Sequence, residues 1–427
     1  MHTFIVTGDW SGNERTRTTQ SATVASSASQ AHTCAQDRSF AETTLQEVLD
    51  YARERNFAGY DYSDGTSSPL RDLIPGDNRW VNIALQETAK RAPINLRPVL
   101  GIPKRRNFKG CALFASASLR AYDCTGREQH LDDATELVQW LADNRRSYPY
   151  GWGHNHDLQL LTRRIPRNTP DIIATAYGVR AIMDLDQYRE TEEAAIAGEA
   201  VPHFIETELL DAVDDGFRLR YEPTAPRGTY VLNANAVGGA LLVELAAAYD
   251  QPDLRPLGEA LLDYVASRQH PIGGWTYMDP PEASHLSMDN HHNGFILESF
   301  MRYAAVTGSD RYADTLERGL SFYRDVLFDS NGAPRWDEMN QYPRDIHAAA
   351  QGIITFTQAG DYMFASRILG WALEAMYDAG RFYYRRNRFY TRRVTLMRWC
   401  QAWMAYAIGQ YATHIDGTGL VASPQTS

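Results

Sequence analysis

The strongest constraint on the fold is a strict alternation of two kinds of helical segment over residues 79–411. Segments rich in small and apolar residues alternate with segments that are amphipathic and charged. Both kinds repeat their apolar residues at helical spacing, and the period-2 alternation of strands is scarce. The small-residue segments begin near Lys109, Asp171, Asn233, Asp289, Asp345 and Thr395.

These starts are 62, 62, 56, 56 and 50 residues apart, which indicates a repeat architecture. Residues such as Gly238 and Gly239 suit close packing in an inner ring, and the charged segments suit a half-exposed outer ring. We therefore predict an all-α fold, an (α/α)6 toroid of six helical hairpins, with an open solenoid as the alternative. The expected outer helices are 79–91, 130–144, 190–210, 254–268, 310–327 and 361–378, with an additional helix at 41–54.

The two ends of the sequence differ in composition from the rest. Residues 11–38 are rich in Ser, Thr, Ala and Gln and have almost no large apolar side chains. Such a segment buries too little apolar surface to become ordered. We expect a disordered tail at 1–38, a single toroid domain at 39–415 and a second disordered tail at 416–427.

Charge and hydropathy narrow the classes of partner. A net charge of −11 argues against nucleic-acid binding, which needs a basic surface. The longest apolar run, 236–249, is interrupted by Glu244 and is shorter than the roughly 20 residues of a membrane span. The first residues lack the order of a signal peptide, and the four cysteines form no CxxC pair. We expect a cytoplasmic protein with no membrane span.

The loops that precede the inner helices carry aromatic residues beside carboxylates and amides. In a toroid these loops lie at one end, and their side chains converge on a funnel. Aromatic rings stack on the C–H faces of sugars while polar groups bind the hydroxyls. Packing is the better explanation for any single ring here, and only the collection favours a site. The aromatic candidates for sugar binding are Tyr60, Trp152, Trp275, Tyr277, Trp336 and Tyr384.

The segment MDNHHNGFILE is the most distinctive of these. Asp289 or Asn290 can cap a helix, which leaves His291 and His292 in its first turn as candidate acids, bases or sugar ligands. Glu298 falls deeper on the same helix and is expected to anchor hydrogen bonds. No His-x3-His pair or nearby cysteine completes a metal site, so we predict neither metal nor cofactor.

Two carboxylates on either side of a glycosidic bond would indicate hydrolysis, at about 5–5.5 Å for retention or 6.5–9.5 Å for inversion. The candidates are Asp157, Asp289, Asp337, Glu338 and Asp345, whose separations the sequence does not determine, and Asp157 with Asp289 or Asp337 is the preferred pair. His291 or Tyr342 would instead move a proton. Asp171 and Asp345 are read as helix caps.

Residues 381–398 contain seven arginines, an unusual density in an acidic protein. Arginine binds carboxylates in bidentate fashion, so the run indicates an anionic ligand such as a uronate, a sulfated sugar or a phosphate. A solvated arm is the alternative. The polar and charged candidates for substrate binding are Asp61, His154, Asn290, His292, His347, Arg385, Arg386 and Arg392.

Several motifs resemble those of a known group. FAGYDYSDGTSSPL, GWGHNHDLQ, NTPDIIATAYGVRAIMDL and SMDNHHNGFILESF are similar to segments of prokaryotic polysaccharide-biosynthesis-associated proteins, in the same order over residues 40–410. Tyr62 stands where that group usually has Pro, and His154–His156 replace a more aromatic stretch. The resemblance implies a six-hairpin, glycosidase-like toroid. A more distant similarity is to the α/α domains of D-glucuronyl C5-epimerases and polysaccharide lyases.

Together these patterns predict an enzyme that acts on an anionic oligosaccharide or polysaccharide, by epimerisation, elimination or hydrolysis. A non-catalytic glycan-binding or assembly protein on the same scaffold is the second hypothesis. A terpenoid cyclase is the third, because residues 269–275 fit a Q-x3-G-x-W repeat. The missing DxDD acid motif disfavours that third hypothesis.

Overall fold

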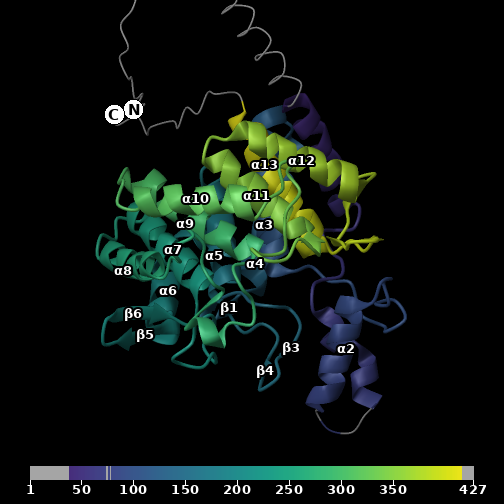
Figure 1. Cartoon of the computed structure of the whole chain (residues 1–427), viewed down its shortest axis with the longest axis horizontal. Coiled ribbons are helices and arrows are strands. Elements are labelled where there is room, and N and C mark those ends of the chain that lie inside the picture. Colours follow the sequence, from purple (N-terminus) through teal and green to yellow (C-terminus); the bar gives the residue numbers. More distant parts are fainter. Residues whose placement is uncertain (1–37, 74–75, 77, 416–427) are drawn as a thin grey trace, which may run out of the picture.

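The computed structural model describes residues 38–73, 76 and 78–415, and over these residues the chain is a ring of helical hairpins (Figure 1). The predicted all-α toroid is confirmed. The inner helices are α3 (Phe108–Thr125), α5 (Ile172–Asp186), α7 (Leu232–Ala248), α9 (Asn290–Thr307), α11 (Ile346–Gln358) and α13 (Trp403–His414), which a π-helical turn, η5 (Met397–Ala402), precedes.

The outer helices alternate with the inner ones along the chain. Their sequences keep apolar residues on one face, and this face packs on the inner ring while the charged face meets solvent. They comprise residues 38–53, α4 (Glu128–Asn144), α6 (Glu192–Phe204), α8 (Leu254–Ser267), α10 (Ala313–Val326) and α12 (Tyr362–Met376).

The ring closes on itself, which excludes the open solenoid. Each inner helix packs against the next, and α13 packs against both α11 and α3, so the last inner helix contacts the first. Small residues allow close contacts between the two rings. A Cβ atom on Gly239 of α7 would lie 2.8 Å from the carbonyl oxygen of Gly258 on α8.

The first hairpin differs from the prediction, which placed α2 (Arg79–Arg91) in the outer ring and treated the helix near 41–54 as an addition. Helix 38–53 is the first outer helix, because Arg53 forms an ion pair of 2.6 Å with Asp133 of α4 and Gln46 lies 3.0 Å from His130. Its apolar face is buried at Leu45 and Leu49. Amphipathic spacing alone does not distinguish the two helices.

The helix α2 belongs instead to an arm, residues 57–106, that projects from the ring (Figure 1). The arm begins and ends at a β-bridge between Gly59 and Arg105, whose backbones exchange hydrogen bonds of 3.1 and 3.0 Å. It also contains two short helices, η1 (Asp64–Ser67) and η2 (Pro69–Leu73). The base of the arm therefore lies beside the start of α3.

Short antiparallel strands brace the loops at the ring ends. The largest of these sheets has the order β13-β12-β9. The strands are β1 (Arg146–Ser147), β2 (Tyr150–Gly151), β3 (Leu158–Gln159), β4 (Arg164–Ile165), β5 (Leu210–Val213), β6 (Gly216–Leu219), β7 (Tyr230–Val231), β8 (Met278–Asp279), β9 (Arg344–Asp345), β10 (Tyr377–Asp378), β11 (Arg381–Phe382), β12 (Arg385–Arg386) and β13 (Thr391–Arg392).

No helix among the described residues is long and apolar enough to cross a membrane. The two predicted tails lie outside the described residues, apart from residue 38.

A buried network of charges joins the inner helices inside the ring. Glu244 of α7 accepts hydrogen bonds from Arg180 of α5 at 2.8 Å and from Arg302 of α9 at 3.1 Å. Arg302 also donates to Glu298 at 2.9 Å and to the Tyr406 hydroxyl of α13 at 2.8 Å. Glu298 is therefore the buried hydrogen-bond anchor that the sequence predicted. Burial opposes ionisation of Glu244, but the two arginines lower its pKa.

We expect the substitution Glu244→Ala to lower the free energy of unfolding by about 3–5 kcal/mol, because it leaves Arg180 without its buried partner and removes one partner of Arg302. Urea denaturation followed by circular dichroism measures the change. The matched control is Asp132→Ala, which breaks an exposed pair with Arg189 and should cost less than about 1 kcal/mol. Equal losses in the two variants would contradict a structural role for the network.

Candidate active site

The first turns of the inner helices form the centre of the site. Four of these helices start with a side-chain cap that accepts a backbone N–H, namely Asn107 at 3.1 Å, Asp171 at 2.7 Å, Asp289 at 3.3 Å and Asp345 at 3.0 Å. The caps hold the residues of each first turn in place. They also direct the positive ends of several helix dipoles to one region, which favours an anion there.

Asp289 organises a pair of histidines at the start of α9. Its carboxylate oxygens lie 2.9 and 2.8 Å from Nδ1 of His292 and 3.3 Å from Nδ1 of His291. Burial opposes ionisation of Asp289, but the two histidines lower its pKa. Because a carboxylate oxygen accepts, Nδ1–H of His292 is the donor in this contact. His292 is half-buried and its ring lies 4.4 Å from that of Tyr277.

A stack of rings continues from α9 to α11 and η5. The ring of His347 stacks on His291 at 4.7 Å and on Trp403 at 4.5 Å, and the Trp399 ring stands edge-on to it at 4.6 Å. Burial lowers the pKa of His291 to about 3, and that of His347 falls well below its usual value, first by burial and then by His291. Both ring nitrogens of His347 are buried without a hydrogen-bond partner among the described residues. His347 is thus a neutral imidazole with unused hydrogen-bonding capacity.

An arginine and two aromatic residues border this stack. Arg385 of β12 forms an ion pair of 2.6 Å with Asp345, which also accepts the indole N–H of Trp399 at 2.8 Å. The Arg385 guanidinium lies 4.7 Å from the ring centre of Trp336 and 4.5 Å from that of Tyr384. The arginine is therefore held by a carboxylate on one side and by rings on the other.

A second cluster lies across Trp399, where the arm meets η5. Asp61 accepts from Arg398 at 2.9 Å through both oxygens and from Asn107 at 2.8 Å. Burial opposes ionisation of Asp61, but Arg398 lowers its pKa. The rings of His154 and His156 lie 5.3 Å apart beside this pair.

Lys109 and Asp171 are two buried ionisable groups near these clusters. Burial raises the pKa of Asp171 to about 6, against the opposing effect of Lys109. Burial lowers the pKa of Lys109 to about 8, and the positive charge of Arg398 adds to this effect. Asp171 spends one oxygen on its helix cap, and no hydrogen bond of the Lys109 ammonium is found among the described residues. Titration near neutral pH in buried groups is typical of sites that transfer protons.

Two groups of side chains could hold a divalent cation. In the set Asp61, His154 and His156, and in the set Asp289, His291 and His292, the possible ligand atoms all lie within 4.8 Å of one another. Arg398 already supplies a positive charge to the first carboxylate, and the second carboxylate binds a histidine N–H. The second set lies within the four consecutive residues 289–292, whereas the first joins two loops that are far apart in the sequence. The predicted absence of a metal stays a prediction.

The structure brings together about half of the predicted site residues. These share a position at or beside the first turns of the inner helices, within the two clusters. They are Asp61, His154, Tyr277, Asp289, His291, His292, Trp336, His347, Tyr384 and Arg385.

Trp152, Trp275 and Asn290 lie elsewhere. The indole N–H of Trp152 donates to the Leu141 carbonyl at 2.9 Å, and that of Trp275 donates to the Val265 carbonyl at 2.8 Å. Both rings are buried between the inner and outer helices. The Asn290 amide donates to a backbone carbonyl at 2.7 Å. All three are fully used in packing, which residue type alone did not reveal.

The remaining carboxylates are tied to their own loops. Asp157 accepts from the backbone N–H of Arg167 at 2.9 Å and from Arg71 at 3.0 Å. Asp337 accepts from the backbone N–H groups of Met339 at 2.9 Å and Asn340 at 2.6 Å. Both carboxylates therefore hold their own loops in shape.

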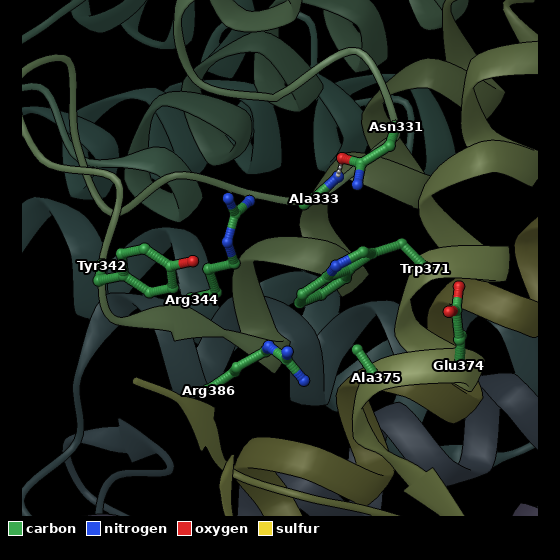
Figure 2. A pocket seen from close by; sticks show the side chains of 8 residues that line it. All are labelled: Asn331, Ala333, Tyr342, Arg344, Trp371, Glu374, Ala375 and Arg386. Atoms are coloured by element: carbon green, nitrogen blue, oxygen red, sulfur yellow. Dashed lines mark hydrogen bonds between the residues drawn. The ribbon is translucent and has the colours of Figure 1, made fainter. Parts of the chain in front are cut away.

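The last four predicted residues also lie outside the two clusters. Tyr60 is half-buried at the base of the arm, 5.5 Å from the Lys104 ammonium. Arg392 donates to the Ala89 carbonyl at 2.9 Å and so ties β13 to α2. Tyr342 and Arg386 line a separate pocket (Figure 2).

Sequence reasoning missed Lys109 and Trp399 as site residues and read Asp171 only as a cap. Arg398 was counted among the seven arginines of residues 381–398 but was not chosen as a site residue. Their shared signal is a charged or aromatic residue at the start of a helix that is otherwise small and apolar.

Comparisons with known proteins support the fold. No protein-family model matches the chain, and no curated protein matches it. Cellobiose 2-epimerase from Bacillus thermoamylovorans is 13% identical, with a TM-score of 0.60 over 72% of this chain and 88% of that one. An unsaturated glucuronyl hydrolase specific for heparin is 11% identical, with a TM-score of 0.60 over 88% and 97%. A D-mannose isomerase is 11% identical, with a TM-score of 0.57 over 73% and 87%.

We expect Asp171→Asn to stabilise the protein at pH 8. The folded pKa of about 6 lies above the unfolded value of 3.8, so the folded protein favours the protonated form of Asp171. This contribution to the free energy of unfolding is complete below pH 3.8 and is lost as the pH rises through 6. Asn caps helices as well as Asp. The gain should be roughly 3 kcal/mol at pH 8 and close to zero at pH 3.5, as measured by chemical denaturation at both pH values.

The matched control is the cap Asp289→Asn. The pKa of Asp289 is lowered in the fold, so its stabilising effect is present above its unfolded pKa and this variant should be less stable at pH 8. A loss of stability in both variants at pH 8 would contradict the assignment of Asp171.

Proposed function

We propose that this chain is an enzyme that acts on a carbohydrate by removing a proton from a carbon next to a carbonyl or carboxylate group. The observation that carries the proposal is the Asp289–His292 pair, a base with an orienting carboxylate. It lies in the same helix-end region as Lys109, whose ammonium forms no ion pair among the described residues. Sugar epimerases and isomerases with the same toroid support the choice of substrate class.

His292 is the proposed base. Its Nδ1–H donates to Asp289, so the lone pair on Nε2 accepts the proton from the sugar carbon. The positive charge that forms on the imidazole is stabilised by the Asp289 carboxylate. The electrons of the C–H bond move to the adjacent oxygen as an enolate.

Lys109, Arg398 and the helix N-termini would stabilise that enolate. Removing a proton next to a carboxylate creates a second negative charge, which nearby cations make less costly. Lys109 with a pKa of about 8 is cationic at neutral pH. A uronate carboxylate suits this region, in line with the anionic ligand predicted from the arginine run.

Asp171 would complete the reaction from α5. With a pKa of about 6, part of this group is a carboxylic acid near neutral pH. In epimerisation its proton goes to the carbon from the face opposite His292. In elimination it goes instead to the leaving oxygen at C4 of a uronate. In either case, exchange with water restores His292 and Asp171.

Hydrolysis is a second candidate because of the same raised pKa, which suits a general acid. Unsaturated glucuronyl hydrolases share the fold. The two-carboxylate mechanism is disfavoured, however, because Asp61 is held by Arg398 and Asp289 by its histidines.

The test is incubation with uronic and neutral oligosaccharides in D2O, followed by NMR and mass spectrometry. We expect deuterium to enter one C–H position of the sugar if the reaction is epimerisation, or a C4=C5 double bond to appear if it is elimination. His292→Ala should lower the turnover number by about 10²–10⁴, whereas His203→Ala, at an exposed histidine of α6, should leave it unchanged.

Two results would overturn the proposal. Glycan cleavage that leaves neither deuterium on carbon nor a new C=C double bond would favour hydrolysis. Glycan binding detected by a rise in melting temperature, with no turnover in any variant, would favour the non-catalytic binding protein.

A further inference from the structure

The strand β12 has two arginines that face opposite sides. Its antiparallel register pairs Arg385 with Asp345 and Arg386 with Arg344. Because successive side chains of a strand alternate between faces, Arg385 reaches the candidate active site and Arg386 turns away from it. The sequence analysis assigned both arginines to one ligand, but they serve two different places.

Arg386 lines a pocket between α12 and the segment that leads to β9 (Figure 2). The cavity has a volume of about 280 Å3, just below the roughly 300–1,000 Å3 of pockets for drug-sized ligands. This volume suits one or two sugar rings. The lining residues are Asn331, Ala333, Tyr342, Arg344, Trp371, Glu374, Ala375 and Arg386.

Trp371 gives the pocket an apolar wall. In Figure 2 its indole extends toward Arg344 and Arg386. The ring is only partly buried, and among the described residues it stacks on no other ring and its N–H has no hydrogen-bond partner. An indole left uncovered in a hollow can stack on the C–H face of a pyranose.

The charges around the indole are nearly balanced. Arg344 is buried and neutralised by an ion pair with Asp329. Arg386 and Glu374 are exposed and form no ion pair within the described part of the chain. One free cation, one free carboxylate, an amide and a phenol provide donors and acceptors together, which suits hydroxyl groups better than a cluster of anionic groups.

We propose that this pocket is a second saccharide-binding site, separate from the active site, which holds a pyranose ring of a longer glycan against Trp371. Arg386, Tyr342 and Asn331 bind its hydroxyls, or its carboxylate if the ring is a uronate. The site goes beyond the proposed function and does not depend on it. Its position behind β12 would keep a long glycan close to the active site.

Isothermal titration calorimetry of the full chain with cellotetraose, mannotetraose and tetragalacturonate tests the proposal. Trp371→Ala should weaken the binding of at least one of these probes by about tenfold or more. The control Trp80→Ala, at an exposed tryptophan of α2, should not change it. The melting temperature of each variant shows that the fold is intact.

His292→Ala distinguishes this site from the active site, because it should leave the Trp371-dependent binding in place. Weaker binding of tetragalacturonate alone in Arg386→Ala would assign a carboxylate to that arginine, and an equal effect on a neutral probe would assign a hydroxyl. The proposal is overturned if none of the probes binds. It is also overturned if binding is unchanged in Trp371→Ala.

Discussion

All inner helices run in the same direction, and this brings most of the candidate site residues together at one end of the ring. Each hairpin returns the chain to the same end of the ring before the next inner helix begins, so residues far apart in sequence meet at successive helix starts. Arg398 reaches Asp61, which is 337 positions away, and His291 stacks on His347 of the neighbouring helix. The caps Asp171, Asp289 and Asp345 fix these starts. Ring closure by α13 is what makes the convergence possible.

The ring contains two groups of buried charges, and they differ in how completely the charges are paired. Around Glu244 each carboxylate meets an arginine, and this network holds neighbouring helices together. Near the helix starts, Lys109 and Asp171 are buried with incomplete partners, and their pKa values move toward neutrality. Such incomplete pairing lowers stability and is common where a protein binds or transforms a ligand. One set of helices therefore carries fully paired charges in one group and incompletely paired charges in the other.

The sequence predicted the inner helices closely because their small-residue composition is local information. The starts expected at Asp171, Asp289 and Asp345 are the observed caps. The sequence did not distinguish helix 38–53 from α2, since both are amphipathic and only long-range contacts separate them. Residue type misassigned Trp152, whose indole is used between the rings, and it could not separate Arg385 from Arg386 without the strand register. Whether a residue belongs to the site depends on where its side chain points and what it contacts, and both are set only in the folded chain.

The ring closes where helix 38–53 meets the end of α12, and the two sides of this contact are made at different times during translation. Glu47 of helix 38–53 accepts a hydrogen bond from Tyr377, 330 residues later in the chain. The ribosome makes the first outer helix early, but the hairpin that covers it emerges almost last. Each intermediate hairpin can pack on its predecessor during translation, whereas the contact between Glu47 and Tyr377 forms only after α12 has been made. A polypeptide that lacks the last hairpin therefore leaves both edges of the open ring exposed.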